Sequence, residues 1–438
     1  MWLFLFFIIC YNKNMFCGNL YSLITPCKGN IKNKKNRIFT SKEFFYLNKK
    51  CVVRLEPKGA VVIYPKMMSG FIYLDNNFKK IFKEEKFSLF GFFKDDVEIL
   101  LKNKIIIRRP NEQSLKLRRL EVKTSGLPIH CLLDVTSDCN CDCLTCYHKD
   151  DLDGFYPKID DLKKRIDKLK KLGILLIEIT GGEPFLRDDL SEILDYIRKQ
   201  DLLYYVVTNG EFLCSFNNSL INSLRNGNGL AISLDGFGNN HDKMRRRPGL
   251  FKKIVKGLKI CSLNKIPVTL VSTLNKGNIG SVSKMLKLAK DNSCILHLRP
   301  TIITGAALSN DIKGSYPANE VRGVLNDKNV RNGFLGERKN TLISCAYYGC
   351  GLRRRISIDV YGRVFPCVMD RSRDIGNINN FTPPMIFKSL VKESNYFLEK
   401  HSNCSVCNKF VKNKKDPACS GFCRFSNSYK NNLIKKYE

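Results

Sequence analysis

The clearest pattern along the chain is an alternation of short apolar runs with amphipathic segments from residue 129 to residue 298. Apolar residues recur at intervals of three and four between Ile159 and Leu172, which is the spacing of one helix face. The apolar runs predict strands at 129–135, 174–179, 204–207, 230–234, 268–274 and 295–298, with helices at 159–172, 190–197, 251–261 and 279–289. Repeated strand and helix units predict a parallel α/β sheet or barrel, whose sites lie at the carboxyl ends of its strands.

A different pattern precedes this region. Residues 51–55, 60–64 and 70–74 are rich in β-branched and aromatic side chains, and Pro57 to Gly59 supplies a turn between the first two runs. Short helices are predicted at 78–85 and 95–102, followed by the apolar residues 105–107. Together these elements predict a small α+β unit, which a polar linker at 110–124 separates from the α/β region.

Composition narrows the class of protein. The chain has 438 residues, a formal net charge of +33 and 19 cysteines. At roughly 150 residues per domain the length predicts about three domains, and 43% hydrophobic residues exclude wholesale disorder. An odd cysteine number in a long chain disfavours a secreted disulfide scaffold and favours metal or cluster ligation in a reducing compartment. Because the basic residues are spread along the chain, we interpret them as solvated surface and expect no specific nucleic-acid partner.

The apolar segment Met1–Ile9 is about half the length that spans a bilayer. It lacks the basic flank of a secretory signal, and Met15 offers a second start. We therefore expect a soluble, cytoplasmic protein without a membrane span.

Four cysteines directly follow the predicted strand at 129–135. Cys139, Cys143 and Cys146 have the spacing C-x3-C-x2-C, which lets one loop hold three irons of a cubane cluster and leave the fourth iron open. Cys141 lies between them and is interpreted as a bystander. A zinc site that uses some of these cysteines is the alternative.

Three further motifs stand where the next three strands end. They are Gly181-Gly182-Glu183-Pro184, Thr208-Asn209-Gly210 and Ser233-Leu234-Asp235-Gly236. The two glycines of the first motif allow a ligand to approach the backbone closely, and its glutamate offers a carboxylate for an ammonium group. Any one motif alone is typical of an ordinary turn, but their order behind the cysteine loop predicts a shared site.

With these motifs the sequence resembles the radical S-adenosylmethionine (SAM) enzymes over residues 128–305, and the resemblance implies a partial (β/α)6 TIM-type barrel. It implies a 4Fe-4S cluster on Cys139, Cys143 and Cys146, and reductive cleavage of bound SAM to a 5'-deoxyadenosyl radical. The implied SAM contacts are Tyr147, Gly181, Gly182, Glu183, Thr208, Asn209, Ser233, Asp235 and Arg245.

The segment from His241 to Arg245 resembles a His-Asp-x-x-Arg-Gly motif of the peptide-modifying branch of that family, with Arg246 in place of the glycine. Arg245 is expected to hold a carboxylate as a bidentate donor. His241 is expected to be structural.

The C-terminal cysteines resemble the SPASM domain, a carrier of auxiliary iron-sulfur clusters, with a β-hairpin arm at residues 363–366. The resemblance implies one cluster on Cys345, Cys350, Cys367 and Cys423, and a second on Cys404, Cys407 and Cys419. The later group has a longer gap than the family pattern, and no cysteine follows Cys423. The second cluster then keeps an open iron, or its cysteines bind zinc instead. Asp370 is a candidate proton-handling residue, or an ordinary exposed aspartate.

The predicted organisation has four parts: a basic extension at 1–45, a winged-helix-like peptide-recognition α+β domain at 46–115, the radical SAM barrel at 125–325, and a Cys-rich iron-sulfur domain at 340–430. The overall pattern is similar to maturases that form thioether crosslinks in ribosomally made peptides. This resemblance implies a leader-bearing precursor peptide and an electron donor such as flavodoxin or ferredoxin as partners, with a basic recognition surface favouring an acidic leader.

Two kinds of alternative stay open. A radical SAM enzyme of this kind can act on a tetrapyrrole or on a residue of another protein. A zinc-dependent, basic nucleic-acid-binding protein is the alternative from another class.

Overall fold

The computed structural model divides the chain into two compact units, Met1–Ser125 and Gly126–Glu438. It describes residues 39–48, 51–57, 59–63, 72–74, 78–79, 82–84, 86–92, 97–98, 100–101, 104–108, 118–123, 127–301, 305–312, 330–332, 355–366, 371 and 373–400. Within these residues, no helix has the length and apolar character that crossing a bilayer requires.

The first unit contains two small sheets. One has the order β5-β1-β6 and is antiparallel, and the other has the order β4-β3-β2-β7. The strands are β1 (Phe44–Leu47), β2 (Val52–Glu56), β3 (Gly59–Ile63), β4 (Ile72–Leu74), β5 (Lys86–Ser88), β6 (Ile106–Ile107) and β7 (Arg118–Glu121). The predicted strands at 51–55, 60–64 and 70–74 are therefore confirmed as β2, β3 and β4.

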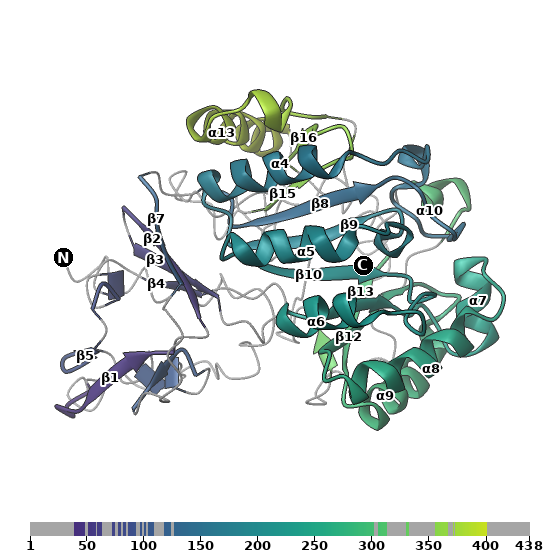
Figure 1. The fold of residues 1–438 in the computed structure, drawn as a ribbon, viewed down its shortest axis with the longest axis horizontal. Coiled ribbons are helices and arrows are strands. Elements are labelled where there is room, and N and C mark those ends of the chain that lie inside the picture. The colour runs from purple at the N-terminus through teal and green to yellow at the C-terminus, as the bar shows by residue number, and fades with distance from the viewer. Residues whose placement is uncertain are drawn as a thin grey trace, which may run out of the picture. The chain divides into compact units, whose positions relative to one another are not determined.

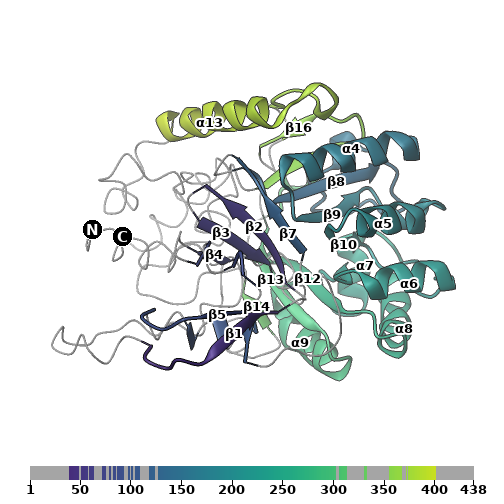
Figure 2. The same ribbon diagram turned by 60° about the vertical axis from the view of Figure 1, so that its left-hand side comes forward.

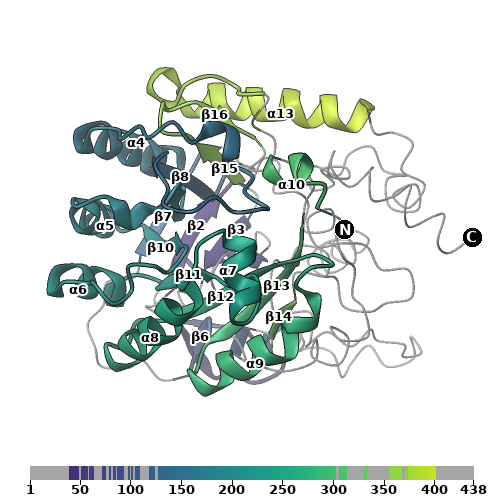
Figure 3. The ribbon, with the colours of Figure 1, turned by 90° about the vertical axis from the view of Figure 1, so that its right-hand side faces the viewer.

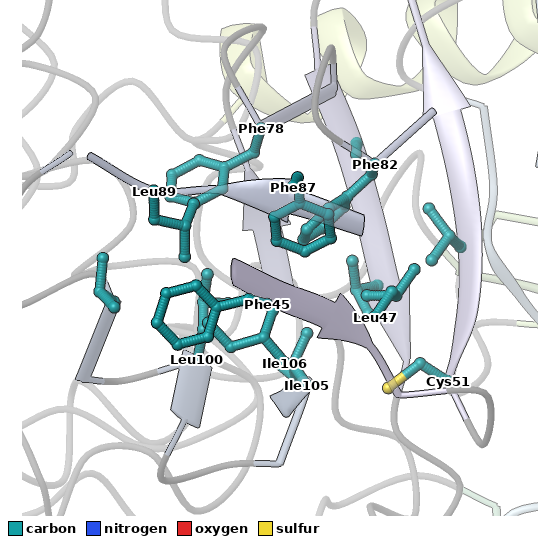
Figure 4. Close-up of a cluster of buried hydrophobic side chains, with 14 of the residues drawn as sticks. Phe45, Leu47, Cys51, Phe78, Phe82, Phe87, Leu89, Leu100, Ile105 and Ile106 are labelled. Carbon is teal, nitrogen blue, oxygen red and sulfur yellow. The ribbon is translucent and has the colours of Figure 1, made fainter. Parts of the chain in front are cut away.

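Phenylalanines dominate the core of this unit. Phe45, Phe82, Phe87 and Leu89 are almost fully buried in one apolar cluster with Cys51 at its edge (Figure 4). The rings of Phe82 and Phe87 lie 5.8 Å apart in a tilted arrangement that aromatic pairs favour. Burial of each such side chain contributes about 1.5–3 kcal/mol, so this cluster holds the two small sheets together.

Two predictions for this unit need correction. The polar segment at 110–124 contains strand β7, which pairs in parallel with β2. Its side chains alternate between half-buried and exposed, so main-chain hydrogen bonds hold an edge strand that has almost no apolar pattern. Strand β1 begins at Phe44, within the predicted extension, and Lys86–Ser88 forms strand β5 directly after the predicted helix 78–85.

The second unit is built on a sheet in which β8 to β13 run parallel and adjacent in chain order. The strands are β8 (His130–Thr136), β9 (Leu176–Gly181), β10 (Leu203–Thr208), β11 (Leu230–Ser233), β12 (Val268–Leu274) and β13 (Ile295–Pro300). All six were predicted, and the α/β class with a central parallel sheet is confirmed.

Helices follow the strands and cover one face of the sheet, as Figures 1 and 2 show for α4, α5 and α6. The helices are α4 (Ile159–Leu172), α5 (Leu190–Lys199), α6 (Asn218–Asn226), α7 (Asn239–Arg245), α8 (Leu250–Leu263), α9 (Val282–Asp291), α10 (Ala306–Ser309) and α13 (Pro383–Lys400). Helix α4 buries Leu162, Ile166, Leu169 and Leu172, the face that its sequence predicts. Helices α6 and α7 were not predicted, because each buries just two residues.

Further strands add to both edges of this sheet. Strand β14 (Val330–Asn332) pairs in parallel with β13, and β15 (Arg355–Ile358) pairs in parallel with β8. Strand β16 (Val364–Phe365) then pairs antiparallel with β15, which confirms the predicted hairpin at 363–366. Short 3-10 turns complete the unit at Lys149–Asp151 (η3), Pro184–Leu186 (η4), Ile279–Ser281 (η5) and Ile378–Asn380 (η6).

Candidate active site at the carboxyl ends of the strands

The cysteine loop connects the end of β8 to η3. Cys139, Cys143 and Cys146 are free thiols, the second buried and the other two half-buried. Two main-chain hydrogen bonds tie this loop to distant segments: Leu144 N–H donates to Met244 O at 2.9 Å, and Ala306 N–H donates to Cys146 O at 2.8 Å. Figure 3, viewed from the end of the sheet where α7 and α10 lie, shows these two helices at the ends of the strands.

Gly181 and Gly182 let the end of β9 approach the cysteine loop. Gly181 has φ +123°, and a Cβ on it would lie 2.2 Å from Thr136 O. A Cβ on Gly182 would lie 1.9 Å from Asp138 O. No larger side chain fits at either position, because the neighbouring backbone occupies the space. The backbone before Cys139 thus makes a close approach to both glycines, and their predicted contact with a ligand stays a prediction.

Glu183 is buried and held by three donors. Its carboxylate accepts from Phe185 N–H at 3.2 Å, from Thr208 Oγ1 at 2.8 Å and from Asn209 N–H at 2.7 Å. Burial raises the pKa of Glu183 to about 7, although these hydrogen bonds act in the opposite direction. The predicted motifs at the ends of β9 and β10 therefore meet at one carboxylate.

Asp235 and Arg245 bring the end of β11 and helix α7 to the cysteine loop. Arg245 Nη2 lies 2.7 Å from Asp235 Oδ2, and Arg245 Nη1 donates to Cys143 Sγ at 3.5 Å. Asp235 Oδ1 accepts from Thr273 N–H at 2.8 Å, and Asp235 N–H donates to His241 Nδ1 at 3.0 Å. His241 thus fixes the turn after β11, in agreement with its expected structural role.

The three thiols of the loop differ in acidity. The hydrogen bond from the Cys141 thiol, helped by Arg245, lowers the pKa of Cys143 to about 6 against the effect of burial. Burial raises the pKa of Cys139 to about 12 and the pKa of Cys146 to about 11. Cys143 is therefore the thiol that loses its proton most readily.

Two further predicted residues lie beside this loop or near it. The Tyr147 ring meets the edge of the His148 ring with centroids 4.0 Å apart, and burial raises the pKa of the Tyr147 phenol. Ser233 is the last residue of β11 and is half-buried.

Sequence reasoning missed a polar network that supports the site. Glu211 accepts from Asn140 Nδ2 at 2.5 Å, from Arg247 at 2.8 Å through both carboxylate oxygens, and from Lys253 Nζ at 2.6 Å. Asn209 Nδ2 donates to Asn140 Oδ1 at 2.7 Å. Asn140 of the cysteine loop is thereby fixed to the end of β10. The one sequence feature that indicated this network is the position of Glu211, directly after the motif Thr208-Asn209-Gly210.

A polar cavity of about 120 Å³ lies at the carboxyl end of β8, against the turn between β15 and β16. Arg371 reaches into it and donates to Asp134 Oδ2 at 2.7 Å, with its other terminal nitrogen 3.0 Å from His148 Nε2. Burial raises the pKa of Asp134 to about 6, against the effect of Arg371. In this cavity His148, at the end of the cysteine loop, lies next to Arg371, more than 200 positions later in the chain.

A second unpredicted cluster lies deeper along the strands. Glu178 of β9 accepts a hydrogen bond from the Tyr205 hydroxyl of β10, and its carboxylate lies 3.3 Å from His130 Nε2 of β8. These side chains lie on the sheet face opposite the one that α4 and α5 cover, since they alternate with the core residues Ile177 and Ile179. The face that those helices leave open therefore carries ionisable groups.

Several predicted site residues lie outside the described residues. They are Cys345, Cys350, Cys367, Asp370, Cys404, Cys407, Cys419 and Cys423. Within the described ranges, no three His, Cys, Asp or Glu side chains are arranged to hold one metal ion. The donor set of the cysteine loop fits an iron-sulfur cluster, since three thiols come from one loop and a buried guanidinium lies against one of them. Arg245 Nε is buried without a hydrogen-bond partner among the described residues, so it leaves a donor free for an anionic ligand.

Comparison with known proteins agrees with this geometry. Residues 133–289 match the model of the radical SAM superfamily. The chain is 30% identical over 203 residues to the antilisterial bacteriocin subtilosin biosynthesis protein AlbA of Bacillus subtilis. This alignment covers 45% of the chain and 44% of AlbA. The chain is 31% identical over 187 residues to the sporulation killing factor maturation protein SkfB of the same organism, covering 42% of this chain and 45% of SkfB. The chain thus spans less than half the length of these two relatives.

Among solved structures, Streptococcus suis SuiB bound to S-adenosylmethionine aligns with a TM-score of 0.58 at 14% identity, over 86% of this chain and 98% of SuiB. SuiB bound to its precursor peptide SuiA aligns with a TM-score of 0.53, also at 14% identity, over 74% of this chain and 83% of that one. At such low identity the likeness shows a shared fold. Together with the family match, it shows that the second unit of this chain contains a radical SAM domain.

Proposed function

We propose that the chain is a radical SAM enzyme that modifies a ribosomally made peptide, with formation of a thioether crosslink as its reaction. The observation that carries this proposal is the convergence of three free thiols, Glu183 and Arg245 at the carboxyl ends of neighbouring parallel strands. The similarity to AlbA and SkfB, which are named for subtilosin biosynthesis and sporulation killing factor maturation, supports a peptide substrate.

Cys139, Cys143 and Cys146 would hold a 4Fe-4S cluster. When bound, the cluster and SAM supply the reductive cleavage that yields methionine and a 5'-deoxyadenosyl radical. Within the chain, Glu183 offers a buried carboxylate for the methionine ammonium group, and the free Nε of Arg245 offers a donor for its carboxylate. Tyr147 offers an aromatic face, and Thr208 and Asn209 hold Glu183 in place.

Water exclusion is the second task of these residues. Glu183 and Asp235 are each 1% exposed, and Thr208 is 2% exposed. Their charges and hydrogen bonds therefore act in a medium of low dielectric constant, where they are stronger than in bulk water. A primary radical reacts with nearby hydrogen donors, so the exclusion of water from these residues would protect it until the substrate is in position.

The roles of the remaining parts of the chain are proposed from the family resemblance. We propose that residues 46–115 recognise the leader of the precursor peptide, that residues 125–325 form the barrel, and that residues 340–430 carry auxiliary clusters. We further propose an electron donor such as flavodoxin or ferredoxin as a partner. The solved complex of SuiB with its precursor peptide SuiA supports a peptide-binding role for a chain of this fold.

Co-expression with a candidate precursor peptide, followed by mass spectrometry, tests the reaction. Forming a thioether between a cysteine sulfur and a carbon removes two hydrogen atoms from the peptide. One would pass to the 5'-deoxyadenosyl radical, and the other would leave as the thiol proton while a proposed auxiliary cluster accepts its electron. Each crosslink therefore lowers the peptide mass by two hydrogens and removes one alkylatable thiol. Co-expression with the Cys146→Ala variant is the matched control and must leave the peptide mass unchanged. A peptide that is unchanged by an enzyme shown to cleave SAM would contradict this choice of substrate.

A further inference from the structure

Arg245 contacts a cluster-loop thiol and a carboxylate at the same time. Its Nη1 donates to Cys143 Sγ at 3.5 Å, and its Nη2 lies 2.7 Å from Asp235 Oδ2. The thiols of Cys139 and Cys146 instead receive hydrogen bonds from backbone groups, at Cys141 and His148. Arg245 therefore places a full positive charge against one of the three predicted ligands.

The surroundings strengthen this contact. The Arg245 side chain is 14% exposed and the Asp235 side chain 1% exposed, so water and salt screen their charges weakly. Asp235 is fixed in turn, because Asp235 Oδ1 accepts from Thr273 N–H on β12 at 2.8 Å. The guanidinium is therefore held between α7, which carries Arg245, and the ends of β11 and β12, which fix Asp235.

Such a contact has a known electrostatic consequence for iron-sulfur clusters. Hydrogen bonds to the sulfurs and the local charge set the reduction potential of a cluster. Reduction adds one negative charge, so a guanidinium that donates to a ligand sulfur stabilises the reduced state and raises the potential. A neighbouring carboxylate opposes reduction and lowers the potential.

We propose that Arg245 raises the reduction potential of the cluster held by Cys139, Cys143 and Cys146, and that Asp235 limits this rise while it holds Arg245 in place. The inference rests on the proposed cluster and goes beyond the expected contact of Arg245 with a carboxylate of SAM. The two roles are compatible, because Nη1 and Nη2 are engaged by Cys143 and Asp235 while Nε stays free.

Redox titration of the anaerobically reconstituted full chain tests this proposal. The protein is titrated with dithionite in the absence of SAM and peptide, and reduction is followed by electron paramagnetic resonance (EPR). The signal that the Cys139→Ala variant lacks is assigned to this cluster, apart from the signals of the proposed auxiliary clusters. The Arg245→Met variant is expected to have a lower midpoint potential than the wild-type protein. The Arg245→Lys variant keeps the charge but not the geometry of the guanidinium, so its decrease is expected to be smaller.

Three further variants separate the hydrogen bond from the charge. Asp235→Asn leaves Arg245 uncompensated, and its potential is expected to rise. The double variant Arg245→Met with Asp235→Asn keeps the net charge but loses the N–H···S contact, so its potential is expected to lie between those of Arg245→Met and the wild-type protein. Arg246→Met removes a charge of the same sign from the adjacent, exposed residue, which pairs with Asp142, and is expected to change the potential little.

The proposal is overturned if Arg245→Met and Arg245→Lys retain the wild-type potential, or if Asp235→Asn lowers it. If Arg245→Met fails to assemble a cluster, the Arg245→Lys and Asp235→Asn variants decide the matter. A wild-type protein without any cluster would overturn the proposed function as well. A protein that binds the cluster but has the same midpoint potential in the wild type and the Arg245 variants would overturn this inference alone.

Discussion

The two units of the chain both bury charged side chains, but these side chains converge on different partners. In the first unit, Arg54 and Glu56 lie on the same strand, β2, and form a buried ion pair at 2.5 Å. In the second unit, Glu183 follows β9 and Arg245 belongs to α7. Glu183 N–H donates to Asp138 O of the cysteine loop, and Arg245 Nη1 donates to Cys143 Sγ. A buried ion pair between two residues of one strand is typical of a structural role. Charges gathered from several strands onto one loop form a candidate site.

The largest effect is expected in the cysteine loop. Cys139→Ala removes one of three predicted ligands, so cluster iron and 5'-deoxyadenosine formation are expected to fall below detection. Cys141→Ala is the matched control within the same loop, and SAM cleavage is expected to stay within about tenfold of wild type, since losing a supporting contact costs far less than losing a ligand. Iron analysis and chromatography of the nucleoside products measure both. Equal losses in the two variants would contradict the bystander role of Cys141.

The contact between β9 and the cysteine loop gives the next largest effect. A Cβ at Gly182 would lie 1.9 Å from Asp138 O, so Gly182→Ala displaces the backbone before Cys139. A shift of about 1 Å in a catalytic group costs about 100-fold in rate, and a loss of that size is expected in SAM cleavage. Gly280→Ala is the control, because a Cβ there meets no atom within 4 Å. A Gly182→Ala enzyme of normal rate would refute the tight packing.

A smaller, pH-dependent effect is expected at Glu183. Burial raises the pKa of Glu183 to about 7, so the carboxylate loses its charge as the pH falls through that value. If this carboxylate holds the ammonium group of SAM, the dissociation constant of SAM is expected to rise about tenfold between pH 8 and pH 6. Equilibrium dialysis with labelled SAM measures it. Glu183→Gln is expected to bind more weakly at pH 8 and to show no such pH dependence, whereas the same pH dependence in both proteins would assign it elsewhere.

The smallest effect on SAM cleavage is expected from the first unit. Phe82→Ala leaves a cavity in its phenylalanine core and is expected to destabilise this unit by about 3–5 kcal/mol. The rate of SAM cleavage without peptide is expected to be unchanged, while peptide modification falls. Thermal unfolding and a nucleoside assay measure the two effects. Phe90→Ala, at a side chain 56% exposed, is the control. A matching loss of SAM cleavage in Phe82→Ala would break the distinction between the units.

Much of the second unit was predictable from sequence because its buried parallel strands are continuous apolar runs. The six strands follow from these runs, and helices α4, α5, α8 and α9 follow from the amphipathic segments between them. Helix α7 did not, because it buries just His241 and Met244 and shows no apolar repeat. In the first unit, β7 escaped prediction because backbone pairing with β2, rather than side-chain burial, holds it.

The site shows the same division. Cysteine spacing and the motifs at strand ends were visible in the sequence, because these residues are close in the chain or follow strands. The partners of those residues were not visible: Asn140 meets Glu211 across 71 positions, and Arg245 meets Cys143 across 102. Such contacts depend on the tertiary arrangement of several strands, which periodicity does not encode.

The proposed cluster and its reaction with SAM are tested most directly on the purified wild-type protein. After anaerobic purification, iron and acid-labile sulfide are measured, and SAM and dithionite are then added. We expect iron and sulfide in cluster stoichiometry, and formation of 5'-deoxyadenosine with methionine as the second product. Zinc without sulfide, or a loaded cluster that leaves SAM intact, would contradict this expectation.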